Sequence, residues 1–499
     1  MNSNDIRQLQ PQQLWQNFYS LTQIPRPSGK KEAIGQFLEN FGKSLGLETL
    51  RDEIGNVLIR KPATSGMEKR KPVILQAHMD MVPQKNSNVS HNFDTDPIQA
   101  VVDGDWVRAQ ETTLGADNGI GLAAALTVLQ SDNIAHPALE VLVTVDEETG
   151  MHGAFALKPN FLKGEILLNL DSEDEGELYI GCAGGLDADI TFRYQEVPVP
   201  EGDVALKISL TGLKGGHSGV DIHLQRANAN KLLFRFLKKA VAEYEARLAW
   251  MEGGNLRNAI PREAFALLTV PADGVDDLIE LVKDFENLFV EENQFVEDNI
   301  RLQVEQVKLP TGLMPEEIQD DLINGVTACP NGVFRFIPEV PDVVETSNNL
   351  AVVKSDGSTI RLRCLLRSSV ESRKEELASM IESVFSLAGA HIDFSGGYPG
   401  WKPNLDSPIL KVMTVVYKKQ FGSKPKIKII HAGLECGIIG MHYPDMDMIS
   451  FGPTIRYPHS PDEKVNIASV EKFWDFLLAT LQNIPEKYIS KMQLKNSFQ

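Results

Sequence analysis

The chain has 499 residues, of which 42% are hydrophobic and 23% charged, as expected for a globular protein with more than one hydrophobic core. Its net charge of -19 argues against nucleic acid or an anionic membrane as a partner, because either would favour a basic surface. Residues 1–20 lack the apolar core of a signal peptide, and no apolar run is long enough to cross a bilayer, so we expect a cytoplasmic protein.

The first elements along the chain are a helix and a buried strand. Apolar side chains recur at helical spacing in residues 30–46, and the apolar run 73–77 has the length of a strand and ends at His78 and Asp80. A hairpin is expected around 103–104. Ligands of open α/β sheets bind at the carboxyl ends of the strands, because the loops converge there. The His-x-Asp pair alone is a weak signal, since a capped strand end explains it at least as well.

Three further segments place acidic side chains in comparable positions. The first segment leads into a strongly helix-forming stretch, where an ordinary N-terminal cap is the competing explanation of the aspartate. The other two segments are apolar strands. The segments are 114–121, 139–145 and 166–170, and the acidic residues are Asp117, Glu147, Glu148 and Asp171. Neighbouring carboxylates at the ends of buried strands repel one another, so we expect cations among them.

The pattern of the chain changes twice, which predicts a discontinuous first domain. From residue 186 to 389 alternating strands and long helices indicate an inserted α+β domain with a mostly antiparallel sheet. Parallel-sheet character returns with a helix at 409–420 and strands at 426–431 and 446–451. We therefore predict an α/β domain of residues 1–185 and 390–499, with a mixed, mostly parallel sheet flanked by helices. His459 lies in a proline-bounded loop of this domain.

Two histidines and several carboxylates at the strand ends form a ligand set of nitrogen and oxygen, which suits Zn²⁺, Mn²⁺ or Co²⁺. The four cysteines form no C-x-x-C pair, which argues against a thiolate zinc site. Two ions suit the number of ligands better than one, because a carboxylate can bridge ions about 3.5–4 Å apart and the water between them becomes a hydroxide nucleophile. The residues thus predict metal-assisted hydrolysis of an amide.

Six motifs together resemble the M20 family of metallopeptidases, and specifically its aminoacyl-histidine dipeptidase branch (peptidase D, Xaa-His dipeptidase). The resemblance covers nearly the whole chain. The motifs are residues 77–80 (AHMD), 115–119 (GADNG), 146–150 (DEETG), 169–171 (NLD), 215–219 (GGHSG) and 458–460 (PHS). No motif departs from the family pattern at a position that should perform chemistry.

The resemblance assigns roles to the residues of the first domain. His78 and Asp171 would bind one metal ion, Glu148 and His459 the other, and Asp117 would bridge the two. Glu147 would be the general base, since it is free to move a proton while its neighbour binds metal. Asp80 would accept the second ring N–H of His78 and so orient it. The family also has a cis peptide after the bridging aspartate, here between residues 117 and 118.

The resemblance makes the inserted domain, residues 186–389, a lid through which a homodimer forms. His217 would stabilise the tetrahedral oxyanion, in its own or in the partner's site. Asn258, Arg367 and the backbone of Gly433 would bind substrate, and a guanidinium suits the C-terminal carboxylate of a dipeptide. For Arg367 a surface salt bridge is the competing interpretation.

From these observations we expect a two-metal aminopeptidase-type dipeptidase acting on unblocked dipeptides, including Xaa-His substrates such as carnosine. A metal-bridged hydroxide would attack the peptide bond, with Glu147 as the base. Zn²⁺ is the first expectation for the metal, with Co²⁺ or Mn²⁺ as alternatives. Two other functions remain open: an N-acyl-amino-acid deacylase or carboxypeptidase with the same metal centre, and a non-catalytic metal- or peptide-binding protein on the same scaffold.

Overall fold

The computed structural model describes residues 5–487, and it divides into two compact units. The first unit contains the chain up to Gly181, residues 403–429, and the chain from Glu435 onward, and the second contains residues 182–402 and 430–434. Strand β19 (His391–Tyr398) pairs with β9 (Gly184–Arg193), so it belongs to the second unit although its sequence pattern placed it in the first. The return of residues 430–434 to the second unit has no counterpart in the sequence pattern.

The first unit is built on an eight-stranded sheet in the order β1-β2-β6-β3-β7-β21-β8-β20. Strands β6, β3, β7 and β21 run parallel, and β1, β2 and β8 run antiparallel to their neighbours, so the predicted mixed α/β sheet is confirmed. The bounds are β1 Glu48–Arg51, β2 Val57–Lys61, β3 Val73–His78, β6 Leu139–Thr144, β7 Ile166–Asn169, β8 Glu177–Cys182, β20 Lys426–Ile430 and β21 Asp447–Ser450. Every residue of β3, β6 and β7 is buried, because helices cover the sheet.

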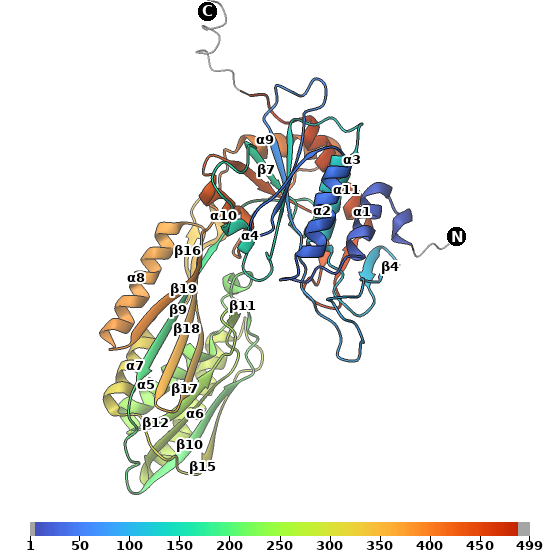
Figure 1. Ribbon diagram of the computed structural model, residues 1–499. Helices are drawn as coiled ribbons and strands as arrows, with labels where there is room; N and C mark the ends of the chain where they lie inside the picture. Colours follow the sequence, from blue (N-terminus) through green and yellow to red (C-terminus); the bar gives the residue numbers. More distant parts are fainter. Residues whose placement is uncertain (1–4, 488–499) are drawn as a thin grey trace, which may run out of the picture. The chain divides into compact units, whose positions relative to one another are not determined.

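The helices of the first unit surround this sheet in Figure 1. α3 is apolar on all sides and almost wholly buried, since it packs on β3 and is covered by α1. α9 packs on β21 and on α11. The helices are η1 Ile6–Gln8, α1 Gln12–Thr22, α2 Glu32–Ser44, α3 Ala116–Gln130, α4 His152–Phe155, α9 Pro408–Phe421, α10 Glu435–His442 and α11 Ile467–Gln482.

A small four-stranded sheet of the first unit holds the loop that carries His459. Its order is β22-β23-β5-β4, and the β4–β5 hairpin turns at 103–106, as predicted. The His459 loop connects β22 to β23, and β23 pairs with β5. The strands are β4 Ala100–Asp103, β5 Trp106–Ala109, β22 Ile455–Arg456 and β23 Lys464–Asn466.

The second unit is a nine-stranded antiparallel sheet whose longest path runs β15-β10-β14-β12-β17-β18-β9-β19, with β16 paired to β17. Four helices share one hydrophobic core with this sheet. A separate ribbon pairs β11 with β13. The strands are β10 Asp203–Thr211, β11 Gly216–His217, β12 Arg247–Gly253, β13 Ala259–Ile260, β14 Ala264–Pro271, β15 Arg301–Val307, β16 Gly332–Ile337, β17 Val340–Asp356 and β18 Thr359–Ser368, and the helices are α5 Ala229–Tyr244, α6 Val275–Asn293, α7 Glu316–Ala328 and α8 Glu371–Leu387.

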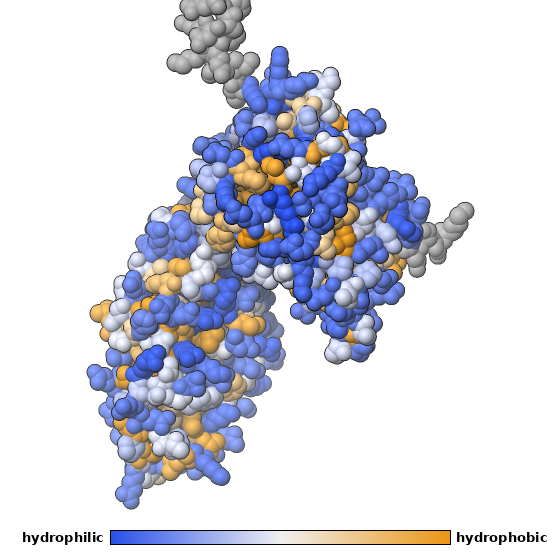
Figure 2. All heavy atoms as spheres, viewed as in Figure 1, coloured by the Kyte–Doolittle hydropathy of each residue, from blue (hydrophilic) through white to orange (hydrophobic). Residues whose placement is uncertain are grey.

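Apolar side chains gather inside each unit in its own core. Figure 2 shows that hydrophilic residues predominate on the visible face of both units, with apolar residues scattered between them. Among residues 5–487, no helix combines the length and the apolar character that crossing a bilayer requires.

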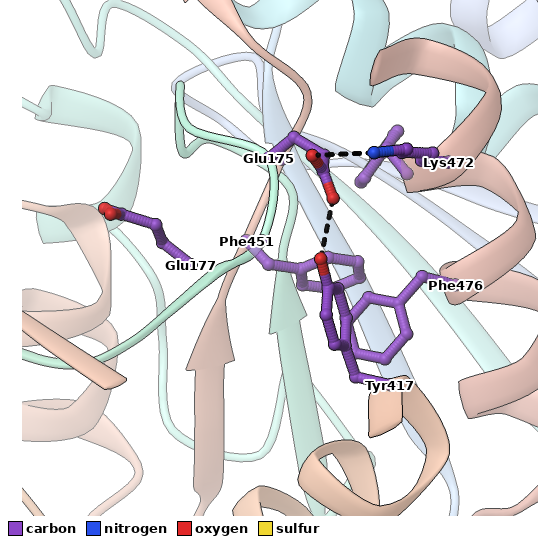
Figure 3. Close-up of a pocket in the computed structure, with 9 residues that line it drawn as sticks. Glu175, Glu177, Tyr417, Phe451, Lys472 and Phe476 are labelled. Carbon is purple, nitrogen blue, oxygen red and sulfur yellow. Dashed lines mark hydrogen bonds and ion pairs between the residues drawn. The ribbon is translucent and has the colours of Figure 1, made fainter. Parts of the chain in front are cut away.

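The segment that follows Asp171 is held to the helices of the first unit by one polar side chain. The Tyr417 hydroxyl donates to Glu175 at 2.7 Å, and the Lys472 ammonium lies 3.4 Å from the other oxygen of Glu175 (Figure 3). The Tyr417 ring packs edge-on against Phe476, with centroids 5.1 Å apart. These contacts fix the chain between the end of β7 and the start of β8.

Gly121 allows α3 to approach the loop that carries Asp171. A Cβ atom at this position would lie 2.4 Å from the Leu170 carbonyl oxygen and 2.5 Å from Oδ1 of Asn118. We therefore expect Gly121→Ala to destabilise the chain by about 1–3 kcal/mol, because the helix and the loop must move apart. Gly274→Ala is the control, since a Cβ there meets nothing within 4 Å. Urea denaturation of both variants measures the difference, and equal stabilities would contradict it.

Candidate metal centre

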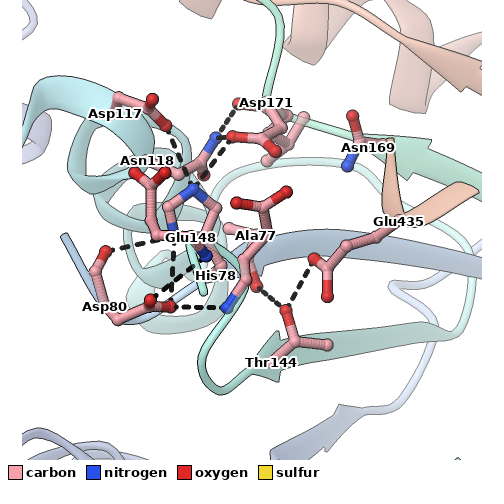
Figure 4. A network of polar contacts seen from close by, with 12 residues as sticks. Ala77, His78, Asp80, Asp117, Asn118, Thr144, Glu148, Asn169, Asp171 and Glu435 are labelled. Carbon is pink, nitrogen blue, oxygen red and sulfur yellow. Dashed lines mark hydrogen bonds and ion pairs between the residues drawn. The ribbon is translucent and has the colours of Figure 1, made fainter. Parts of the chain in front are cut away.

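His78 ends the buried strand β3 with both ring nitrogens engaged (Figure 4). Its Nδ1 lies 3.1 Å from the backbone carbonyl oxygen of Asp80, which makes Nδ1 the donor. Nε2 lies 3.0 Å from Oδ1 of Asp117 and 3.3 Å from Oδ1 of Asp171, and it is the nitrogen that carries the lone pair when the ring is neutral. This nitrogen thus points at two carboxylates.

Asp117 presents its two oxygens to two different histidines. Oδ1 faces His78, whereas Oδ2 lies 3.3 Å from Nε2 of His459. The same Nε2 lies 3.0 Å from Oε2 of Glu148. The five side chains therefore form two groups, His78 with Asp171 and His459 with Glu148, which meet at the carboxylate of Asp117.

Asn118 links the two aspartates of this cluster. The peptide between Asp117 and Asn118 is cis, as the family resemblance implied. The Asn118 amide donates to the Leu170 carbonyl at 2.9 Å and also to the carboxylate of Asp171. One side chain thus ties the start of α3 to the end of β7.

Asp80 supports the cluster in a way that differs from the sequence prediction. Its carboxylate accepts the Ser28 hydroxyl at 2.7 Å and the backbone N–H groups of Glu147 and Glu148 at 3.0 and 3.3 Å. The ring of His78 donates to the carbonyl of Asp80, while the Asp80 carboxylate lies 3.5 Å away. Asp80 therefore positions both His78 and the acidic turn, and only the tertiary structure reveals the second task.

Glu147 lies beside this cluster with a carboxyl group that makes no hydrogen bond or ion pair to any residue of 5–487. Burial is the main reason why the pKa of Glu147 lies well above its usual value. The nearby charge of His78 opposes this shift, and the charges of Asp171, Glu435 and Glu148 add to it. A carboxyl whose pKa is raised in this way is a stronger base than an exposed glutamate.

The histidine pKa values reflect the excess of acid around them. Hydrogen bonds to Asp117 and Glu148 raise the pKa of His459 to about 11. Burial acts to lower the pKa of His78, but Asp171, Asp117 and Asp80 outweigh it and hold the pKa well above the usual value. The cluster therefore attracts positive charge strongly.

The residues present suit a divalent cation. Ligand atoms of His78, Asp117 and Glu148 lie within 4.8 Å of one another, and the donors are the imidazole nitrogens and carboxylate oxygens that Zn²⁺ and similar ions take. Oε1 of Glu148 is buried and has no hydrogen-bond partner among the described residues. A buried carboxylate oxygen without a partner is costly unless a cation faces it.

Three buried charged residues near the cluster were not found from the sequence. Arg26 donates to the carbonyls of Met79, Asp80 and Gly115, and Glu463 accepts backbone N–H groups around Asp117. Glu435 accepts hydrogen bonds from Gln76 and Thr144 below the cluster (Figure 4). Only Glu463 carries a signal in the sequence, its position four residues after His459, and that signal does not specify a contact.

The second unit brings His217, in β11, close to Asn258, which directly precedes β13, and the Ser218 N–H donates to the Asn258 carbonyl at 2.8 Å. Nδ1 of His217 accepts the N–H groups of Gly219 and Val220 at 3.1 and 3.2 Å, so the proton of the neutral ring is on Nε2. Burial, together with the charge of a nearby arginine, Arg367, lowers the pKa of His217 and keeps the ring neutral.

Arg367 is only 4% exposed, and its one side-chain hydrogen bond within the described chain is to the Tyr398 hydroxyl at 3.1 Å. Its Nε is buried without a partner, and no acid pairs with it among residues 5–487. The competing interpretation as a surface salt bridge is therefore wrong. Gly433 lies in the 430–434 segment of the same unit, two residues after His431, whose ring bonds Ser347 at 2.7 Å.

A mixed α/β sheet with histidine and carboxylate ligands at its strand ends defines a metallohydrolase. The chain belongs to peptidase family M20/M25/M40, whose model it matches over residues 74–483.

Two similar proteins span nearly the whole chain. The chain is 48% identical to the cytosol non-specific dipeptidase of Escherichia coli (strain K12) over 484 residues, which are 97% of this chain and 100% of that protein. It is 50% identical to the aminoacylhistidine dipeptidase of Vibrio alginolyticus, whose crystal structure superposes with a TM-score of 0.92 and covers 97% of this chain and 99% of the other. The aminopeptidase PepT of Bacillus cereus shares the fold at 17% identity, with a TM-score of 0.56 and coverages of 95% and 99%.

The raised histidine pKa values predict that metal binding releases protons. Because the pKa of His459 is about 11, its ring is positively charged at pH 7 in chelator-treated protein, and the raised pKa of His78 favours the charged form of that ring as well. A cation that takes Nε2 must displace this proton, so we expect release of about one to two protons per chain and an affinity that rises with pH. Calorimetry in two buffers of different ionisation enthalpy measures the release, and identical heats in both buffers would refute the prediction.

Proposed function

We propose that this chain is a dipeptidase that uses two divalent metal ions to hydrolyse unblocked dipeptides, including Xaa-His substrates such as carnosine. The observation that carries the proposal is the division of the Asp117 oxygens between His78 and His459. The names of the Escherichia coli and Vibrio alginolyticus relatives, both dipeptidases at 48–50% identity over nearly the full length, support the substrate class.

In this proposal His78 and Asp171 hold one ion, Glu148 and His459 hold the other, and Asp117 is shared. When bound, the two ions supply Lewis acidity toward the peptide carbonyl and lower the pKa of the attacking water. Zn²⁺ suits the mixed nitrogen and oxygen ligands, and Co²⁺ and Mn²⁺ are the alternatives.

Glu147 is the general base of the proposed reaction. It takes a proton from the attacking water and passes it to the leaving amine, for which its raised pKa is suitable. The Asp80 carboxylate accepts a hydrogen bond from the backbone N–H of Glu147 at 3.0 Å, and the Asp80 carbonyl accepts one from Nδ1 of His78. It therefore positions the base and one ligand without touching the reacting atoms.

The second unit supplies the groups that recognise substrate. His217 donates from Nε2 to the developing oxyanion, since its Nδ1 is occupied by two backbone N–H groups. Arg367 pairs with the free C-terminal carboxylate, which satisfies a guanidinium that is otherwise buried without an acid. Asn258 and the backbone of Gly433 add hydrogen bonds to the peptide.

We also propose a cytoplasmic homodimer formed through the second unit. β19 is an edge strand with most residues exposed, and such an edge can pair with a second copy. The Escherichia coli relative is named a cytosol dipeptidase, which supports the cytoplasm. Sedimentation equilibrium tests the dimer.

Two further expectations stay predictions: that the second unit acts as a lid, and that His217 serves either the site of its own subunit or that of the partner.

The substrate class is tested by a panel of peptides with defined metals. The proposal expects release of histidine from Gly-His and carnosine and no release of acetate from an acetylated amino acid. Acetate release instead would establish the deacylase, and metal-loaded protein that cleaves neither substrate would be a binding protein.

Glu147→Ala separates catalysis from metal binding. Because Glu147 moves the proton but holds no ion, turnover of Gly-His should fall about 10²–10⁴-fold while the metal content stays that of the parent chain. Elemental analysis and steady-state kinetics measure the two quantities. A variant that loses its metal along with its activity would contradict the assigned role.

Arg367→Lys tests recognition of the substrate carboxylate. A hydrogen bond to a charged group is worth about 1.5–3 kcal/mol, so kcat/KM for a dipeptide should fall roughly 10–100-fold. The same dipeptide with an amidated C-terminus is the control, since it lacks the carboxylate and should be affected little by the substitution. Equal losses on both substrates would remove Arg367 from carboxylate binding.

A further inference from the structure

Glu463 is a buried carboxylate that gathers four consecutive backbone N–H groups. The residue is only 2% exposed. Oε2 accepts from Leu114 and Gly115 at 2.7 and 2.9 Å, and Oε1 accepts from Ala116 and Asp117 at 2.8 and 3.2 Å. Leu114 and Gly115 precede α3, and Ala116 and Asp117 are its first two residues, so these N–H groups have no acceptor within the helix.

Arg26 holds the backbone of residues 114–117 through a carbonyl group, whereas Glu463 holds it through N–H groups. The Arg26 guanidinium donates to the Gly115 carbonyl at 2.5 Å and to the carbonyls of Met79 and Asp80, each at 3.0 Å. Gly115 has a φ of 70°, and a Cβ atom there would lie 2.6 Å from Nη2 of Arg26. The turn that carries Asp117 is therefore fixed to the end of β3 through Arg26.

Glu463 fixes the same turn to the loop that carries His459. That loop has no regular structure between β22 and β23, and within it the Glu463 N–H donates to the Ser460 carbonyl at 3.0 Å. Nε2 of His459 lies 3.3 Å from Oδ2 of Asp117, and this distance depends on how the two segments are joined. Beside that contact, the Glu463 carboxylate joins the two segments by four hydrogen bonds.

We propose that Glu463 is a positioning residue of the metal centre, which sets the place of Asp117 relative to His459 by holding residues 114–117 on its carboxylate. The inference rests on the metal-binding part of the proposed function. Since Asp117 is the ligand common to both groups, a displaced turn weakens the whole site, whereas an ordinary helix cap would affect only folding stability.

Glu463→Gln tests this role with an almost unchanged side-chain shape. An amide keeps one acceptor oxygen but turns two N–H donors toward backbone groups that are donors themselves. Residues that position metal ligands typically contribute about 10–100-fold in metal affinity, and we expect a loss of this size for Glu463→Gln. Titration calorimetry of the full-length, chelator-treated protein with Zn²⁺ measures the affinity directly.

Glu140→Gln is the matched control. Glu140 is also a buried carboxylate that accepts two backbone N–H groups, from Lys163 and Gly164 at 2.7 and 2.8 Å, but it lies near the start of β6, away from the metal ligands. Both variants should unfold at lower temperature than the parent without metal, and only Glu463→Gln should lose Zn²⁺ affinity. An unchanged affinity in Glu463→Gln, or an equal loss in Glu140→Gln, overturns the proposal.

Glu463→Asp covers the case in which the glutamine variant does not fold. The shorter carboxylate keeps the charge but cannot reach all four N–H groups. The Zn²⁺ affinity of this variant should therefore also fall, and an affinity equal to the parent's would overturn the proposal.

Peptidase assays on the parent chain separate the role of Glu463 from the proposed function. A parent chain that binds Zn²⁺ but cleaves no dipeptide refutes the proposed function and leaves the comparison of affinities valid.

Discussion

Repulsion among buried carboxylates is the constraint on which the first unit depends. Asp171 contacts His78, Glu148 contacts His459, and Asp117 contacts both histidines. Glu147 lies beside them. Like charges in a low-dielectric interior cannot all be ionised without compensation. The raised pKa values of the two histidines are the response of the chain's own groups to this excess of acid, and a divalent cation answers the same need more completely.

The unit treats its buried acids in two ways. The oxygens of Asp80, Glu463 and Glu140 accept hydrogen bonds from backbone N–H groups, a hydroxyl or an arginine. These donors stabilise a carboxylate inside the protein. The acids that face the histidines have few such donors, and one oxygen of Glu148 has none among the described residues. The first group shapes the backbone, and the second is left with capacity for a cation.

The second unit presents the opposite electrostatic problem. Arg367 is a buried cation that pairs with no acid of residues 5–487. Burial, together with the charge of Arg367, lowers the pKa of His217 and, to about 3, that of His431. Neutral imidazoles beside an uncompensated guanidinium form an environment for an anion.

The sequence by itself determined the family, through its motifs, and the mixed α/β class. It also predicted which side chains gather in one cluster, because apolar runs ending in His78, Glu147 and Asp171 predict strands whose carboxyl ends meet at one edge. It also indicated the cis peptide, through the resemblance alone. The tertiary structure decided what spacing cannot encode. Three contacts join segments up to 349 positions apart: β19 with β9, His459 with Asp117, and Glu463 with residues 114–117. The structure also showed that no acid of the described residues pairs with Arg367. Such contacts depend on how strands register and loops fold, and a linear pattern carries no record of either.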